Sequence, residues 1–184
     1  DMARLQQCVK ECQEMAATDI YLQVHREGKS WFKSDLADSS PFADIRAKGG
    51  YDPLQSFIDL ASAHDIRVHA WLNVFNLASN RDAPILKQLG TQALLTDSLG
   101  ISLNDYSLEG RPPDSRKEFF SIDTPLLWLD PSHPQVLQYY VSLASELVAN
   151  YPQLKGVHLD FFRYPYLCPF KPTSRIKFGF DFGY

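Results

Sequence analysis

Residues 156–165, GVHLDFFRYP, bring an acidic side chain to the end of a strand-like run. Apolar residues alternate with His158 up to Asp160, and Arg163 follows three residues later. The catalytic side chains of (β/α)8 barrels come from the carboxyl ends of the strands, and carboxyl groups carry out the cleavage of glycosidic bonds. We therefore predict that Asp160 is a catalytic carboxylate of a sugar-cleaving enzyme. The alternative is structural, because an aspartate at a strand end also caps turns.

Two further segments, residues 19–28 and residues 66–75, alternate in the same way. Side chains two residues apart point to the same face of a strand. The polar face of the three strands is predicted to comprise Tyr21, Gln23, His25, His69, Trp71, Asn73, His158 and Asp160. The opposite face is apolar, as expected where a parallel sheet packs against helices. We therefore expect the polar face to point into the interior of a barrel.

The polar face supplies most of the predicted substrate-binding residues. The amides of Gln23 and Asn73 can orient sugar hydroxyl groups, or they can anchor loops. Trp71 can stack on a sugar ring or belong to the core. His69 and His158 can contact the ligand or be interior histidines with satisfied hydrogen bonds.

Asp160 has a basic residue close by in the sequence, Arg163. Arg163 is expected to pair with Asp160 or with a backbone carbonyl group, and the first pairing would lower the pKa of the carboxyl group. A hydrolase whose metal is held by His69, His158 and Asp160 is an alternative, but no HxH or HExxH spacing supports it. We predict no metal site and no cofactor. The sequence also lacks the GxSxG, GxGxxG, P-loop and CxxC motifs.

Helical patterns alternate with the strands. Residues 5–15 repeat apolar side chains at three- and four-residue spacing. Asp52 can cap a helix that begins at Pro53. A long helix is expected before the last strand, with Asp130 or Ser132 as its cap. This order of strands and helices predicts an α/β fold with a parallel sheet.

The remaining segments read as connections. Residues 29–50 are expected to form a loop, and residues 76–129 a long loop with a short helix near residues 83–89. After Pro165 we expect an aromatic, proline-rich loop and then the start of a further helix in residues 174–184.

Composition limits the class of protein. Hydrophobic residues make up 45% of the 184 residues and aromatic residues 13%, which is typical of a globular domain. The net charge of −4, with scattered lysine and arginine, argues against nucleic acid or an anionic membrane surface as a partner. No apolar run approaches the roughly 18 residues of a membrane span, and this chain shows no signal peptide.

Three segments together resemble a known family. They are residues 51–73 (YDPLQSFIDLASAHDIRVHAWLN), residues 129–148 (LDPSHPQVLQYYVSLASELV) and residues 156–165, followed by SRIKF. They resemble glycosyl-hydrolase-like family 10, a group of barrels similar to the C-terminal hydrolase domain of an exopolysaccharide protein. The resemblance implies a TIM barrel that acts on polysaccharide or peptidoglycan-like glycans and is usually exported.

The resemblance also assigns positions. Asp160 falls on the position presumed to carry the catalytic carboxylate, and Trp71 and Asn73 fall on the HAWLN strand. Arg163 and Tyr164 fall on the extension that borders the pocket. The chain departs from the family where members often have two consecutive acidic residues, because Phe161 follows Asp160 here.

These observations lead to one expectation for the whole chain. Residues 1–184 should form one domain, an incomplete parallel (β/α)8 TIM barrel of about strands 2–4 with their helices, with the remainder supplied by sequence outside this chain. Its expected activity is hydrolysis of a polysaccharide or cell-wall glycan, with Asp160 as one of two carboxyl groups. The alternative is a carbohydrate-binding or scaffold barrel that has lost hydrolysis.

Overall fold

Three parallel strands form the centre of the computed structural model, which describes residues 2–96, 100, 102 and 127–165. They are β1 (Asp19–Arg26), β3 (Arg67–Asn73) and β6 (Gly156–Asp160). The sheet order is β2-β1-β3-β6, and the short β2 (Lys29–Ser30) pairs with β1 in the antiparallel direction. The α/β class with a parallel sheet is therefore confirmed.

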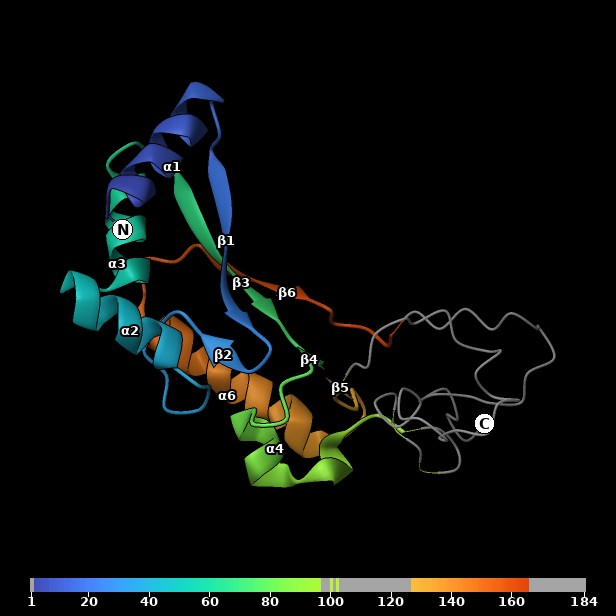
Figure 1. Ribbon diagram of the computed structural model, residues 1–184. Helices are drawn as coiled ribbons and strands as arrows, with labels where there is room; N and C mark the ends of the chain where they lie inside the picture. The colour runs from blue at the N-terminus through green and yellow to red at the C-terminus, as the bar shows by residue number, and fades with distance from the viewer. Residues whose placement is uncertain (1, 97–99, 101, 103–126, 166–184) are drawn as a thin grey trace.

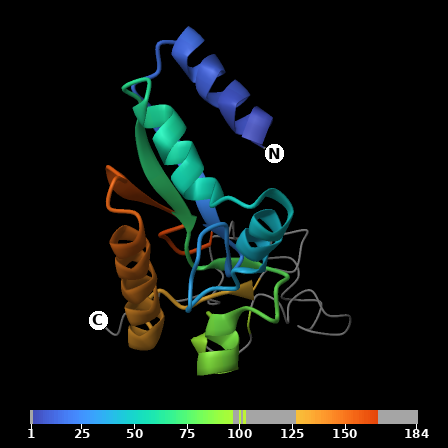
Figure 2. The same ribbon diagram turned by 90° about the vertical axis from the view of Figure 1, so that its left-hand side faces the viewer.

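Helices cover one face of this sheet. Figure 1 shows them on one side of the strands, and Figure 2, viewed from that side, shows α3 in front of the strands with α1 beside it. The principal helices are α1 (Met2–Glu14), α2 (Ser40–Gly49), α3 (Pro53–Ser62) and α6 (Pro134–Asn150). The side chains of Val68, Ala70 and Leu72 on β3 are buried beneath them. The apolar face of β3 therefore packs on helices, as the alternation predicts.

The predicted start of α3 is confirmed in detail. Asp52 Oδ1 accepts hydrogen bonds from the backbone N–H groups of Leu54 and Gln55, both at 3.0 Å, and Pro53 occupies the first turn. The side chain satisfies two N–H groups that have no partner within the helix. This cap fixes where α3 begins, so that its buried face, including Phe57 and Ile58, meets the sheet.

Two local expectations were wrong. The segment of residues 29–50 is not only a loop, because it contains β2 and α2, and α2 ends at Gly50 in the left-handed conformation. Only Phe42 of α2 is buried, so the apolar periodicity that identifies a helix is weak there. At α6 the cap residue is His133, with no side-chain bond, while Asp130 accepts hydrogen bonds from the backbone and hydroxyl of Ser132 in a turn before the helix.

The connection between β3 and α6 has its own structure. It contains β4 (Asn76–Ala78), α4 (Pro84–Leu89), a 3-10 turn η1 (Thr91–Ala93) and β5 (Leu127–Trp128), and β4 pairs with β5. The short helix near residues 83–89 is thus confirmed. The loop and helix start expected after residue 165 lie outside the described residues. None of the helices in the described ranges is long and apolar enough to cross a membrane.

Candidate functional site

The face of the sheet opposite the helices carries the polar side chains in tiers. The strand register places Tyr21 beside His69, Gln23 beside Trp71, Trp71 beside His158, and Asn73 beside Asp160. Neighbouring strands lie about 4.8 Å apart, so side chains at one level contact one another. Tyr21 is 55% exposed on this face. The predicted alternation therefore brings seven of the eight polar-face residues together, with His25 as the exception.

The upper tier lies at the carboxyl ends of the strands. Gln23 Nε2 donates a hydrogen bond to Asn73 Oδ1 at 3.1 Å, and Asn73 is only 8% exposed. Asp160, next to Asn73, accepts one side-chain hydrogen bond in the described part of the chain, from the backbone N–H of Phe161 at 2.7 Å. The amide of Asn73 and most of the acceptor capacity of Asp160 are thus left for a ligand.

A strained turn follows Asp160. Phe161 has a φ of 56°, which is rare for a bulky side chain and occurs mainly where surrounding structure enforces it. Its ring packs against Trp128 at 5.7 Å between centroids. The guanidinium carbon of Arg163 lies over both rings, 5.2 Å from Phe161 and 5.5 Å from Trp128. This cation–π cluster holds the turn that presents the N–H of Phe161 to Asp160.

The RYP extension after this turn also packs on the structure. Arg163 Nη1 donates to the backbone carbonyl of Tyr164 at 3.0 Å, which is one of the two kinds of partner considered for it. Burial, and to a lesser degree the Asp130 carboxylate, raises the pKa of the Tyr164 hydroxyl. Arg163 and Tyr164 lie just after the carboxyl end of β6. Their contacts with a substrate remain predictions.

The middle tier is aromatic. His158 meets Trp71 edge to face at 5.9 Å and Tyr21 at 5.5 Å between ring centroids. Nε1 of Trp71 is buried and has no hydrogen-bond partner among the described residues. A buried N–H without a partner costs free energy, so this atom is a donor available to a ligand or a water molecule.

The lower tier is an ion-pair cluster at the amino ends of the strands. His69 Nε2 lies 2.8 Å from Asp19 Oδ1, and Arg67 and Thr18 donate to Asp19 Oδ2 at 2.5 and 2.8 Å. Hydrogen bonds from Arg67, His69 and Thr18 hold the pKa of Asp19 well below its usual range. Tyr21 stacks on His69 at 4.7 Å.

As a member of this cluster, His69 lies far from Asp160 at the other end of the sheet. His69 precedes Asn73 by four residues, or roughly 13 Å along a strand. Its contacts match the interior histidine that was considered as the alternative role. Asp19 and Arg67 were not among the predicted residues, although their shared position at strand starts, with opposite charges, is a signal that could have suggested the pair.

The expected position of His25 is wrong. The register shifts between Gln23 and His25, so that His25 lies opposite Leu72, on the helix side. It is fully buried, its Nδ1 donates to the carbonyl of Asn73 at 2.8 Å, and its ring meets Tyr140 of α6 edge to face at 6.0 Å. Burial lowers the pKa of His25 to about 4. The β-bulge inverts the alternation, and no residue in this segment signals it.

The three side chains of the metal alternative lie apart in the described structure. Within residues 2–96, 100, 102 and 127–165, no three His, Cys, Asp or Glu side chains gather closely enough to hold an ion. His69 is engaged with Asp19, one tier below His158 and two below Asp160. The three proposed ligands therefore do not form a site.

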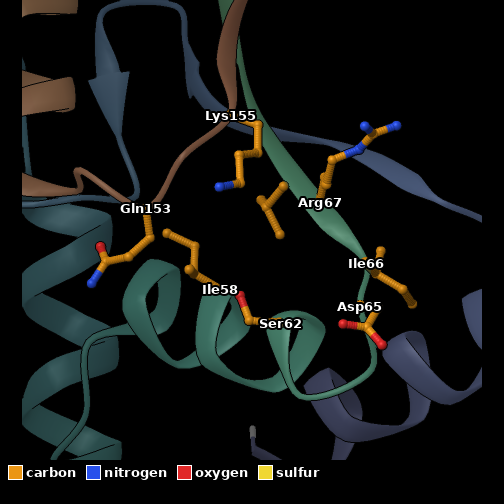
Figure 3. Close-up of a pocket in the computed structure, with 8 residues that line it drawn as sticks. Ile58, Ser62, Asp65, Ile66, Arg67, Gln153 and Lys155 are labelled. Atoms are coloured by element: carbon orange, nitrogen blue, oxygen red, sulfur yellow. The ribbon is translucent and has the colours of Figure 1, made fainter.

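A pocket of about 210 Å³ lies at the opposite end of β3, between α3 and the segment that enters β6. Figure 3 shows Ile58 and Ser62 of α3 facing Lys155 and Gln153, while the guanidinium of Arg67 points away toward its partner Asp19. Chemistry in (β/α) barrels occurs at the carboxyl ends of the strands, and the amino ends serve stability. The candidate site is therefore the upper tier around Asp160.

Comparison with known proteins identifies the family of the chain. The family model described as glycosyl hydrolase-like 10 matches residues 1–175. The chain belongs to this family. Curated relatives named glycosyl hydrolase DigH, from Escherichia coli K12 and from Shigella flexneri, are each 24% identical over 160 residues, covering 83% of the chain. The chain spans about a third of the length of these relatives, 32%.

Solved structures share the fold of this family member. A hypothetical protein from Ruminiclostridium thermocellum aligns with a TM-score of 0.57 at 15% identity, covering 90% of this chain and 73% of the other. A noncanonic maltogenic α-amylase, AmyB, from Thermotoga neapolitana aligns with a TM-score of 0.50 at 13% identity, covering 90% and 36%. At these identities the likeness concerns the fold alone, and it places the chain among TIM-barrel folds.

Proposed function

We propose that this chain is part of a (β/α)8 glycoside hydrolase domain that cleaves a polysaccharide or cell-wall glycan, with Asp160 as one catalytic carboxylate. The observation that carries the proposal is the placement of Asp160 at the carboxyl end of β6, beside Asn73, with one backbone hydrogen bond to its side chain in the described part of the chain. Membership of the glycosyl hydrolase-like family supports the same activity.

The geometry suggests a role for each residue of the site in catalysis or substrate binding. The Phe161 N–H orients the Asp160 carboxylate, and a free oxygen of that group can attack or stabilise an oxocarbenium-like centre. Asn73, held by Gln23, can donate to a sugar hydroxyl beside the carboxylate. Trp71 and His158 would form the floor below the sugar. Glycoside hydrolysis uses two carboxyl groups, and Asp160 supplies one of them.

We further propose that the rest of the domain packs against β6 and α6. The outward side of α6 exposes Leu137, Val141 and Val148, and Leu159 on β6 is 42% exposed. In the described part of the chain β6 is an edge strand. Such an apolar stripe beside an open strand edge suits another β/α unit of the same protein. We also propose that the protein is exported, because its expected substrates lie outside the cytoplasm.

The test is Asp160→Asn in the full-length protein. The amide keeps the size of the side chain and can still accept from Phe161, but it removes the charge. Cleavage of glycan should be lost while the unfolding midpoint stays unchanged. Asp65→Asn is the matched control, because Asp65 is exposed at the far end of β3 with a φ of 58°, a conformation that asparagine tolerates. Retained cleavage within a fewfold of the parent would refute the catalytic role.

A non-catalytic carbohydrate-binding barrel is the second candidate. It is favoured by the single carboxylate of the motif, since Phe161 occupies the position after Asp160. Binding of oligosaccharide by the full-length protein, with no cleavage across a glycan panel, would support this candidate over hydrolysis.

A further inference from the structure

We infer that Phe162 is a stacking platform for a sugar ring beside Asp160, an inference that rests on the proposed glycan substrate. Phe162 is 60% exposed, although it is a large apolar side chain. One face of its ring stacks on Phe75, with centroids 5.3 Å apart and planes 28° apart. The exposed part of the ring is the surface that the inference assigns to the ligand.

The ring has rigid support. Phe75 is buried, and its ring meets Tyr140 of α6 edge to face at 5.7 Å between centroids. Tyr140 in turn packs on His25 beneath the carboxyl ends of the strands. Phe162 therefore rests on a column of core aromatics, so that little side-chain freedom remains to be lost when a ligand binds.

The strained turn places the backbone of Phe162 close to that of Asp160. Phe162 follows Asp160 by two residues, which keeps their Cα atoms within about 7 Å. The left-handed φ of Phe161 breaks the alternation of β6, so that Phe161 turns to Trp128 while Phe162 reaches Phe75 at the end of β3. The backbone at this point is anchored by the bond from Val74 N–H to the carbonyl of Asp160 at 2.9 Å.

Sugar rings match this surface chemically. A pyranose presents C–H groups on one face, and an aromatic ring offers an apolar, electron-rich face to such groups. The hydroxyl groups at the rim of the sugar remain available to Asn73 and Asp160. A carbohydrate ring is the occupant that the platform and the adjacent carboxylate have in common, because it offers C–H groups to the aromatic face and hydroxyl groups to Asp160.

The test measures binding separately from cleavage. In the full-length protein carrying Asp160→Asn, affinity is measured for linear hexasaccharides of N-acetylglucosamine, β-linked glucose and α-linked glucose, and for solubilised cell-wall glycan. Phe162→Ala should weaken the affinity for the bound glycan roughly tenfold, the scale of one aromatic contact. Phe162→Tyr and Phe162→Trp should keep it within about threefold, because the stacking face remains.

Controls isolate the aromatic face. Met15→Ala removes another exposed apolar side chain, 71% exposed at the amino end of the sheet, and should leave affinity unchanged. Phe162→Leu preserves apolar cover of Phe75 without a ring, and should bind like Phe162→Ala. With Asp160 intact, Phe162→Ala should raise KM more than it lowers kcat, because stacking is present in both the bound substrate and the transition state.

The outcomes separate the two ideas. If Phe162→Ala or Phe162→Leu binds the glycan within twofold of the Asp160→Asn protein that keeps Phe162, the inference of a stacking platform is wrong. The proposed function would be unaffected. Normal cleavage by Asp160→Asn, together with weak binding by Phe162→Ala, would overturn the catalytic role of Asp160 alone. Failure of the parent to bind or cleave any glycan in the panel would overturn both.

Discussion

The two ends of the parallel sheet each hold an aspartate, but the surroundings of the two carboxylates differ. At the amino end, Asp19 is bonded to Arg67, His69 and Thr18. At the carboxyl end, the side chain of Asp160 accepts one backbone bond in the described residues. A carboxylate whose acceptor sites are filled holds strands together, whereas one with free acceptor sites can meet a substrate. The contrast matches the division of stability and chemistry between the two ends of (β/α) barrels.

The aromatic residues at the two ends differ in their partners and are similarly exposed. At the amino end Tyr21, 55% exposed, stacks on His69, which is itself bonded to Asp19. At the carboxyl end one face of the Phe162 ring stacks on the buried Phe75, and the side chain is 60% exposed. We call the amino end, where Asp19 is bonded to three side chains, the closed end, and the carboxyl end, where Asp160 accepts one bond in the described residues, the open end.

The largest effect is expected from comparing Asp160→Asn with Asp19→Asn in the full-length protein. Asp160→Asn should reduce the glycan cleavage rate about 1,000-fold, within the range that a positioned carboxyl group contributes. Asp19→Asn should leave cleavage within about twofold, because Asp19 lies several tiers from the site. The measurement is the cleavage rate of each variant on the same glycan. Equal losses of rate in both variants would contradict the proposed difference between Asp160 and Asp19.

A second prediction concerns pH and His25, which lies under the open end. Its folded pKa of about 4 is below its ordinary 6.5, so the unfolded chain binds the extra proton between these values. Stability should be complete above pH 6.5 and should fall by about 3 kcal/mol as the pH approaches 4. Denaturant unfolding from pH 7 to 4 measures this.

His25→Phe provides the control for that measurement. Phenylalanine keeps a ring against Tyr140 but does not titrate. The free energy of unfolding of His25→Phe should therefore depend less on pH between 6.5 and 4 than that of the parent, even if its value at pH 7 differs. The same slope in parent and variant would show that another group is responsible.

The third prediction concerns the closed end in acid. The pKa of Asp19 is depressed, so its contribution to stability is present above its ordinary value of 3.8 and is lost as the pH falls further. Asp19→Asn should lower the thermal unfolding midpoint at pH 7 by a few degrees and weaken its dependence on pH below about 4. A double-mutant cycle with Arg67→Gln should show coupling between the two positions, and additive effects would argue against the pair.

The smallest effect is expected at Gly156. A Cβ there would lie 3.0 Å from Nδ1 of His69, so the imidazole would have to shift by a few tenths of an ångström. Gly156→Ala should therefore destabilise the protein by less than about 1 kcal/mol. The cost should vanish in a His69→Ala background, and a cost that persists there would place its origin elsewhere.

Much of the sheet could be predicted because strand alternation is a local property. Tyr21 and Gln23, His69, Trp71 and Asn73 lie on the predicted face since each strand keeps a period of two. The helix at Pro53 was predictable because a capping aspartate and a proline are local signals. Helix α2 was not, since its sequence buries only Phe42 and shows little periodicity.

The errors at the site arise where the backbone departs from regular geometry. His25 changes face at a bulge, and Phe161 adopts a left-handed conformation. Both depend on partners far away in sequence: His25 on the Asn73 carbonyl and Tyr140, Phe161 on Trp128. Alternation counted along one strand contains no information about such contacts.

The sequence by itself determined that strands alternate with helices, that a carboxylate ends the last strand, and that the chain resembles its family, because periodicity and motif spacing are written along the chain. Only the tertiary structure decided which aspartate is satisfied and which keeps free acceptor sites, and that Phe162 rather than Phe161 is exposed beside Asp160. Those outcomes depend on strand register, a bulge and one strained turn, all of which are set by contacts between distant segments.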